Sequence, residues 1–314
     1  MRKVLINIKN YLRWYLFGVL VILSVVLWSA EMRENRRGVL TFAVLNIGQG
    51  DALYIESPTG TQVLVDGGPN KNLMKEIPHF LSWYDRHIDM LVVTNPDKDH
   101  YEGFISLLGE YKVDTVIEPG TTNPSPTYAV LEKEIAGKNI PRILGKRGQV
   151  VDLGGGAYLQ ILFPDRDVSG LSSNDGSLVM RLVYGDTSVM LQGDSTAKIE
   201  HYLVGLDGGS LKSTILKAGH HGSRTSSTEE YVSAIAPEWV VASSGADNSY
   251  GHPHKETVDT MTKLSVPFYD TCNNGRLVFH SDGHEFTLEN KNPKPAVVGC
   301  KSYEEKEIIS SRLF

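Results

Sequence analysis

Cysteine is scarce in this 314-residue chain, and an excess of positive charge is missing. The two cysteines, Cys272 and Cys300, have neither CxxC spacing nor the density of a disulfide scaffold. We interpret them as structural or incidental, and they do not fix the redox compartment. Lysine and arginine total 31 against 37 aspartate and glutamate, a formal charge of -6. This balance excludes a strong global attraction to nucleic acid, so any such contact must be local.

Internal repeats and low-complexity stretches are also lacking, and a composition of 41% hydrophobic and 22% charged residues excludes disordered and fibrous proteins. One long apolar run stands out at residues 14–30, which are free of charge over a length near the lower limit for a membrane span. We predict a short cytoplasmic N-terminus (1–13), a transmembrane anchor (14–30) and a linker (31–38). A cleaved signal peptide is the alternative, disfavoured because Trp28 stands where a small residue is expected. The slight positive-inside bias favours a single-pass protein whose large domain is extracytoplasmic.

Residues 39–289 alternate between apolar, β-rich runs and helical stretches, which is typical of an α/β domain. Helices are expected at about 73–84, from about His100, and at about 126–137. Two β-rich halves, each accompanied by helices, predict a layered sandwich. The polar residues 290–314 are expected to form a tail or terminal helix outside the core.

Three strand ends carry side chains that suit a divalent cation. The motif TNPDKDH places two aspartates and a histidine directly after an apolar strand, QGDS places an aspartate after another, and KAGHHGS places two histidines after a third. Carboxylate and imidazole together bind Zn, Mn or Fe, and strand ends at one edge of a sandwich can bring distant residues together. Taken alone, the first motif is equally consistent with a polar loop that caps the next helix.

The motifs VLNIGQGDALYIESPTG, VLVDGG, TNPDKDH, SNDGSLVMRLVYG, LQGD, LKAGHHGS and SYGHPH occur in this order across about residues 39–283. In this order they resemble the ComEC-type metallo-β-lactamase domain of competence and DNA-uptake proteins. The resemblance implies an αββα four-layer sandwich preceded by one transmembrane helix. The multi-span channel region of full ComEC is not in this sequence, so the resemblance is to a stand-alone domain on one anchor.

The resemblance also implies the metal ligands, which would be Asn95, Asp97, Asp99, His100, Asp194 and His220. In a two-ion version, Asn95 and Asp97 would serve the first ion. Asp99, His100 and His220 would serve the second, and Asp194 would join both. Asp66 of VDGG would hold and polarise a ligand, although a turn residue before two glycines is the alternative.

Asn95 stands where the family has its first metal-binding histidine, and Asn174 and Ser177 fall where the wider superfamily often has another. An asparagine oxygen is a poor zinc ligand but suits harder ions. Three outcomes follow, in order of preference: one occupied site, two sites with a harder metal, or a degenerate site with little activity. The cofactor is therefore one or two divalent ions, Zn or Mn.

Other polar residues surround these positions and are expected phosphate contacts or proton donors. They are Lys217, His221, Arg224, His252 and His254. Lys217 could instead be a solvated strand end, and His254 could simply start a helix. The expected catalytic set is Asp66, Asp99, Lys217, His221 and His252.

The implied function is metal-dependent hydrolysis, with phosphodiesterase or nuclease activity on DNA. Two alternatives remain open at this point. One is a catalytically weakened DNA-binding or competence-assembly protein, and the other is a phosphodiesterase for cell-wall phosphoesters. β-Lactam hydrolysis has no support beyond the fold, and a fold does not determine a function.

Overall fold

The computed structural model describes residues 2–34 and 38–300 and divides the chain into two units, residues 1–37 and 38–314. The first unit is one helix, α1 (Arg2–Glu34). Its segment Tyr11–Ser29 is long and apolar enough to cross a membrane, by length and composition. The helix continues past the expected anchor into the expected linker, of which residues 35–37 lie outside the described residues.

The described residues of the second unit form two sheets. The first has eight strands, in which β1, β2, β3, β14 and β15 pair antiparallel and β3 to β6 pair in parallel. In spatial order they are β15 (Phe286–Leu288), β14 (Leu277–Ser281), β1 (Leu40–Val44), β2 (Leu53–Glu56), β3 (Gln62–Val65), β4 (His87–Val92), β5 (Lys112–Glu118) and β6 (Arg142–Leu144).

The second sheet has seven strands, antiparallel from β7 to β10 and parallel from β10 to β13. In spatial order they are β13 (Phe268–Asp270), β12 (Trp239–Ala242), β11 (Ile215–Lys217), β10 (Thr187–Leu191), β9 (Val179–Tyr184), β8 (Ala157–Phe163) and β7 (Val150–Gly154).

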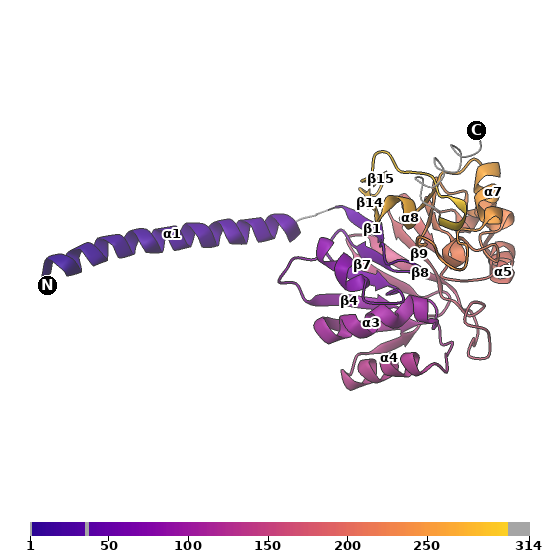
Figure 1. The fold of residues 1–314 in the computed structure, drawn as a ribbon, viewed down its shortest axis with the longest axis horizontal. Coiled ribbons are helices and arrows are strands. Elements are labelled where there is room, and N and C mark those ends of the chain that lie inside the picture. Colours follow the sequence, from indigo (N-terminus) through magenta and orange to yellow (C-terminus); the bar gives the residue numbers. More distant parts are fainter. Residues whose placement is uncertain (1, 35–37, 301–314) are drawn as a thin grey trace. The chain divides into compact units, whose positions relative to one another are not determined.

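Three apolar clusters hold the layers together. Alternate side chains of a strand point to opposite faces, so Phe42 of β1 packs between the sheets while its neighbour Ala43 packs under helices. The outer face of the first sheet is covered by α2 (Leu73–Glu76), η1 (Ile77–His79), α3 (Lys98–Glu110) and α4 (Pro126–Gly137). The outer face of the second is covered by α5 (Ala197–Asp207), α6 (Glu229–Ile235) and α7 (Lys255–Lys263) (Figure 1). The predicted αββα sandwich is confirmed.

Two of the expected helices can be compared with the structure in detail. The helix expected at 126–137 is α4, and the Ser125 hydroxyl accepts a hydrogen bond from the backbone N–H of Tyr128 (3.1 Å), as an N-cap should. The helix expected at 73–84 is wrong in length, because α2 ends at Glu76 and a 3₁₀ turn follows to His79. Pro78 has no N–H, and its ring obstructs a continuing α-helix.

The expectation that residues from 290 onward lie outside the core is wrong for Ala296, Val297 and Cys300, which are buried. The backbone N–H of Ala296 donates to the carbonyl of Phe268 (2.8 Å), so this segment packs beside β13. The side chain of Ala296 joins the apolar cluster that includes Met261 of α7, which accounts for its burial. A disulfide joins Cys300 to Cys272 on α8 (Thr271–Asn274). Residues 301–314 of the expected tail lie outside the described residues.

Candidate metal centre

Polar loops follow the carboxyl ends of the parallel strands in both sheets. The loops after β4, β10, β11 and β12 meet the loop between β1 and β2, as expected where parallel strands end at one edge. Together they enclose a hollow of about 150 Å³ lined by Gln49, Asp97, Asp99, Asp194, His220, His221, Tyr250 and His252. The structure therefore brings the three predicted motifs to one place.

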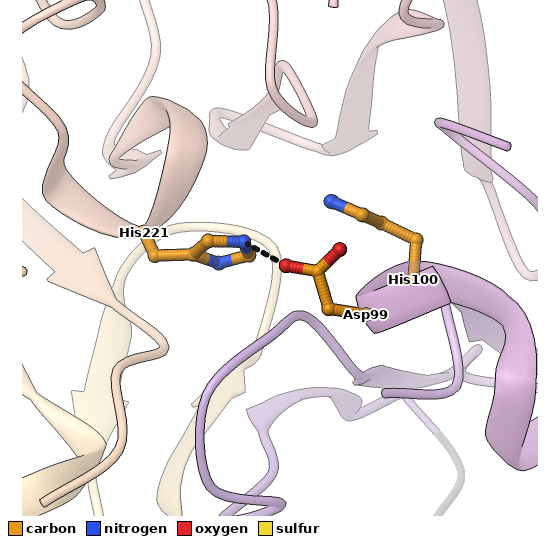
Figure 2. A group of neighbouring side chains, drawn as sticks. All are labelled: Asp99, His100 and His221. Carbon is orange, nitrogen blue, oxygen red and sulfur yellow. Dashed lines mark ion pairs between the residues drawn. The ribbon is translucent and has the colours of Figure 1, made fainter. Parts of the chain in front are cut away.

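Asp99, His100 and His221 form a cluster beside the hollow, and their ligand atoms lie within 4.8 Å of one another (Figure 2). The Nε2 atom of His221 lies 3.2 Å from a carboxylate oxygen of Asp99. Asp194 closes the group, with one oxygen 3.0 Å from Nε2 of His100 and the other 3.7 Å from Nε2 of His221. Two carboxylates and two imidazoles thus converge.

Three buried atoms of this group make no well-aligned hydrogen bond among the described residues: Nε2 of His100, Nε2 of His221 and Oδ1 of Asp194. The two nitrogens face carboxylate oxygens of Asp194 and Asp99 at 3.0 and 3.2 Å. Buried polar atoms in folded proteins are nearly always hydrogen-bonded, so three such atoms in one cluster require an explanation. Imidazole nitrogen and carboxylate oxygen are the ligands that zinc and manganese take. The donor set fits a divalent cation.

His100 is oriented from behind by Asp66, which follows β3. Its Nδ1 lies 2.8 Å from Oδ2 of Asp66, and that carboxylate also accepts from the N–H (2.8 Å) and the hydroxyl (2.5 Å) of Thr94. Burial raises the pKa of Asp66, although His100 and Thr94 oppose this. Burial also disfavours charge on His100, but Asp194 and Asp66 outweigh it and raise its pKa well above the ordinary value. Asp66 therefore contacts His100 on the side away from Asp194, and its positioning role stays a prediction.

His221 is oriented in the same way by Asp51, a residue that the sequence reasoning missed. Its Nδ1 lies 3.0 Å from Oδ1 of Asp51, and Nζ of Lys217 lies 2.8 Å from the same carboxylate. Burial opposes ionisation of Asp51, yet Lys217 and His221 outweigh it and hold the pKa of Asp51 below its usual range. Burial likewise opposes charge on His221, but Asp51 and Asp194 raise its pKa to about 9. Asp51 lies in the GQGD motif, which was the one available signal.

Of the two adjacent histidines, His221 and not His220 enters the central cluster. Both have left-handed backbone (φ 56° and 48°), a strained conformation that concentrates at functional sites. His220 lies at the rim, with Nε2 3.6 Å from Asp194 and Nδ1 3.3 Å from the Thr225 hydroxyl. Burial lowers the pKa of His220. His221 therefore lies among the candidate ligand atoms of Asp99 and His100, and the assignment of His220 as a ligand stays a prediction.

At the start of the TNPDKDH motif, the side chains of Asn95 and Asp97 are hydrogen-bonded to other protein groups. Asn95 is fully buried, and its Nδ2 donates to Oδ1 of Asn174 (2.8 Å) and to the hydroxyl of Ser177 (3.2 Å). Its Oδ1 accepts from the backbone N–H of Asp97 (2.9 Å). The carboxylate of Asp97 accepts from Nδ2 of Asn123 (3.0 Å) and from the hydroxyl of Ser173 (2.8 Å). Protein donors and acceptors thus occupy both expected first-ion ligands.

Lys217 does not reach the hollow, so the expectation that it contacts phosphate is wrong. It is 1% exposed, and its ammonium donates to Asp51 and to the carbonyl of Ala218. A buried ammonium needs such a counter-charge, which explains why it turns inward. Arg224 is exposed, and His254 precedes α7 and accepts from the backbone N–H of Arg224 (3.1 Å).

His252 lines the hollow, and its tautomer follows from its neighbours. The oxygen of the Gln49 side chain accepts from the N–H of Gly245 (3.2 Å), so the Gln49 amide nitrogen faces Nδ1 of His252 (3.2 Å) and donates to it. Burial, followed by the positive charges of His221 and His220, lowers the pKa of His252 to about 3. The ring is therefore neutral near pH 7, with its proton on Nε2.

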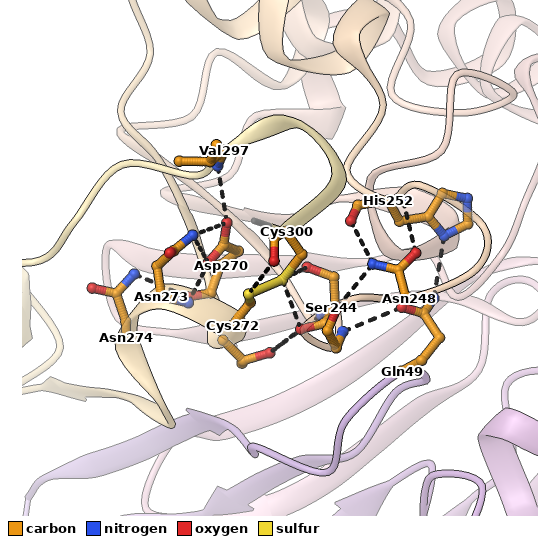
Figure 3. Close-up of a disulfide and its surroundings, with 12 residues drawn as sticks. Gln49, Ser244, Asn248, His252, Asp270, Cys272, Asn273, Asn274, Val297 and Cys300 are labelled. Carbon is orange, nitrogen blue, oxygen red and sulfur yellow. Dashed lines mark hydrogen bonds between the residues drawn. A yellow bond between two sulfur atoms is a disulfide. The ribbon is translucent and has the colours of Figure 1, made fainter. Parts of the chain in front are cut away.

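The loop that carries His252 is tied to the disulfide (Figure 3). The Asn248 amide nitrogen donates hydrogen bonds to the carbonyls of Gly245 (2.8 Å) and His252 (2.7 Å), and its oxygen accepts from the N–H of His252 (2.9 Å). At the start of the loop, the hydroxyl of Ser244 lies 3.7 Å from Sγ of Cys300. The segment around Cys300 therefore supports the wall of the hollow, which the cysteine spacing did not predict.

Comparison with known proteins agrees with this geometry. The model of the metallo-beta-lactamase superfamily matches residues 45–243, and the chain belongs to that superfamily. Within it, the chain is of the ComEC type and is similar to the ComE operon protein 3 of Bacillus subtilis (strain 168), 27% identical over 75% of this chain and 32% of that protein. It is also similar to the competence protein ComA of Neisseria gonorrhoeae, 28% identical over 84% of this chain and 35% of that protein. The chain spans about a third of the length of these relatives.

Among solved structures, a mutant of the CmlA beta-hydroxylase is 13% identical, with a TM-score of 0.50 over 76% of this chain and 53% of that one. This likeness supports the fold alone. The superfamily match identifies a metallo-β-lactamase-superfamily hydrolase.

Proposed function

We propose that this protein is a metal-dependent phosphodiesterase that cleaves DNA, held at a membrane by α1. The observation that carries the proposal is the convergence of three buried, hydrogen-bond-deficient atoms, from His100, His221 and Asp194, beside the carboxylate of Asp99. Such a group fits one divalent cation, Zn or Mn. A bound divalent cation lowers the pKa of water from about 15.7 to roughly 7 and neutralises a phosphoryl oxygen.

The side chains around the cation site have distinct tasks in this proposal. Asp99, His100, His221 and Asp194 would hold the ion, and Asp66 and Asp51 fix the two imidazoles so that each presents Nε2. His252 presents a neutral ring with its proton on Nε2, a donor suited to a phosphoryl or leaving oxygen. His220 lies on the same rim.

DNA as the substrate is supported by the competence relatives and by the form of the hollow. The hollow is small and lies at the surface, which suits one phosphodiester of a long polymer. Tyr250 at its rim is 65% exposed and stacks on His252 (ring centroids 5.7 Å apart). An exposed aromatic ring next to a phosphate site offers a stacking surface for a base, a contact worth roughly 1–3 kcal/mol.

An extracytoplasmic location of the domain is part of the proposal. The Cys272–Cys300 disulfide supports it, because disulfides form and persist in oxidising compartments. The apolar segment Tyr11–Ser29 supports a single span. Protease added to intact cells should then remove the large domain, and full protection of that domain would contradict this topology. Extraction of the protein by carbonate would contradict the anchor.

Hydrolysis by the detergent-solubilised chain tests the activity. Single-stranded DNA and a bis-aryl phosphodiester are offered under zinc, manganese and magnesium, beside His221→Ala and Asp99→Ala. We expect metal-dependent cleavage that both variants lose. A parent protein that binds metal and leaves both substrates intact would contradict the phosphodiesterase proposal.

A second candidate is a catalytically weakened DNA-binding or competence-assembly protein, favoured by Asn95 in place of the family's histidine. Such a protein would keep its affinity for DNA through His221→Ala and Asp99→Ala. A phosphodiesterase acting on cell-wall phosphoesters is the remaining alternative. It would cleave the bis-aryl ester and leave DNA intact.

A further inference from the structure

Both amide hydrogens and the oxygen of the Asn95 side chain make hydrogen bonds within the protein. Its two amide hydrogens go to Asn174 and Ser177, and its oxygen accepts from the backbone of Asp97. The orientation of the amide follows from chemistry, because a backbone N–H can only donate and must face the oxygen. A metal ion bound to that oxygen would compete with the N–H of Asp97 inside a site that is fully buried.

Asp97, the partner expected for the same ion, is engaged in the same way. One carboxylate oxygen accepts from Asn123 in the β5–α4 loop, and the other accepts from Ser173 in the β8–β9 loop. Two neutral donors therefore stabilise a charge that a cation would otherwise neutralise. Among the described residues, Asp97 belongs to none of the carboxylate and imidazole groups with metal-ligand spacing.

At the His100 end of the motif, ligand atoms are left without well-aligned hydrogen bonds from the described part of the chain. His100, His221 and Asp194 each keep a buried atom without a well-aligned hydrogen bond among the described residues, and Asp99 lies among them. Within these six residues, one end carries a buried ligand atom without a well-aligned hydrogen bond to any described residue, whereas the side-chain oxygens of Asn95 and Asp97 at the other end each accept a hydrogen bond from the protein.

We infer that the protein binds a single divalent ion, at Asp99, His100, His221 and Asp194, and that the network of Asn95 and Asp97 takes the place of a second ion. This inference rests on the metal site of the proposed function. The network links the residues after β4 to the β5–α4 and β8–β9 loops. It therefore holds these three segments together, as a second ion would in a two-ion centre. Contacts to the remaining phosphoryl oxygens then fall to side chains, among which His252 presents its Nε2 proton to the hollow.

Metal stoichiometry tests the inference without an activity assay. The full-length chain in detergent is stripped with chelator and titrated with cobalt(II). Visible absorption follows the binding, and zinc per chain is measured by plasma mass spectrometry after gel filtration. We expect saturation at one ion per chain. Two ions per chain would overturn the inference and leave the proposed function standing, whereas no bound metal would overturn both.

Variants at the two ends separate the roles. His221→Ala should abolish binding, and Asn95→Ala should keep one ion per chain while the metal-free Tm falls by roughly 5 °C, since buried hydrogen bonds are lost. Asn292→Ala, at an exposed asparagine, is the control and should change neither quantity. Loss of the ion in Asn95→Ala would identify Asn95 as a ligand and overturn the inference. If Asn95→Ala does not fold, Asn174→Ala removes one acceptor and carries the same two readouts.

Discussion

The segment Asn95–His100 lines the hollow with Asp97 and Asp99, but the side chains at its two ends have opposite surroundings. At one end, Asn95 and Asp97 are satisfied by hydrogen bonds from the protein. At the other end, His100 faces His221 and Asp194 with atoms that make no well-aligned hydrogen bond among the described residues. The difference teaches that a metal motif can be half retained, because each end depends on partners from different loops.

Removal of His221 tests the cation end most severely. We expect His221→Ala to reduce hydrolysis to the uncatalysed background, because the ion loses a central ligand. His220→Ala should keep the ion and lose about tenfold in rate, because His220 lies at the rim. Parallel measurements of rate and metal content check both variants. Equal loss of metal in the two variants would break the distinction between the neighbouring histidines.

Removal of Asp51 tests the buried ion pair that supports His221. Asp51→Ala leaves the buried ammonium of Lys217 without its counter-charge, so we expect a loss of about 3–5 kcal/mol in the free energy of unfolding. Urea denaturation of the metal-free protein measures this loss. Lys217→Met combined with Asp51→Ala is the control and should recover much of the stability. If Asp51→Ala alone were as stable as the parent, the ion pair of Asp51 and Lys217 would not stabilise the fold.

The pH dependence of the metal-free protein tests the charges at the cation end. The pKa of His221 is raised from 6.5 to about 9, so its stabilising contribution is fully present below pH 6.5 and is lost as the pH rises through 9. The free energy of unfolding falls by on the order of 3 kcal/mol over this pH range. The pKa of His252 is lowered to about 3, so its effect is a loss of stability as the pH falls below 6.5. Denaturation midpoints from pH 5 to 10 should peak near 6.5. They should decline less above that pH in His221→Gln, and a flat profile in the parent would contradict the assignment.

The smallest effect is expected at the hydrogen-bonded end. Ser173→Ala removes one donor to Asp97, so we expect a loss of about 1 kcal/mol in stability and no change in metal content. Urea denaturation and metal analysis of the same preparations measure both. A fall in metal content would mean that this end also serves an ion.

The sandwich and the place of the site could be predicted from sequence, since strand periodicity and strand-terminal aspartates and histidines are local signals. Which of His220 and His221 faces inward could not be predicted, because it depends on left-handed backbone at both residues. Asp51 was missed because its partners Lys217 and His221 are 166 and 170 residues away. The same applies to Asn95, whose partners in the β8–β9 loop are 79 and 82 residues away.

The position of a bound ion tests the central claim most directly. Crystals of the protein soaked in zinc would be measured at the zinc absorption edge, where the anomalous signal locates each ion. We expect one peak among Asp99, His100, His221 and Asp194, and no peak beside Asn95 and Asp97. A peak held by Asn95 and Asp97, or no peak at the four residues, would contradict the account.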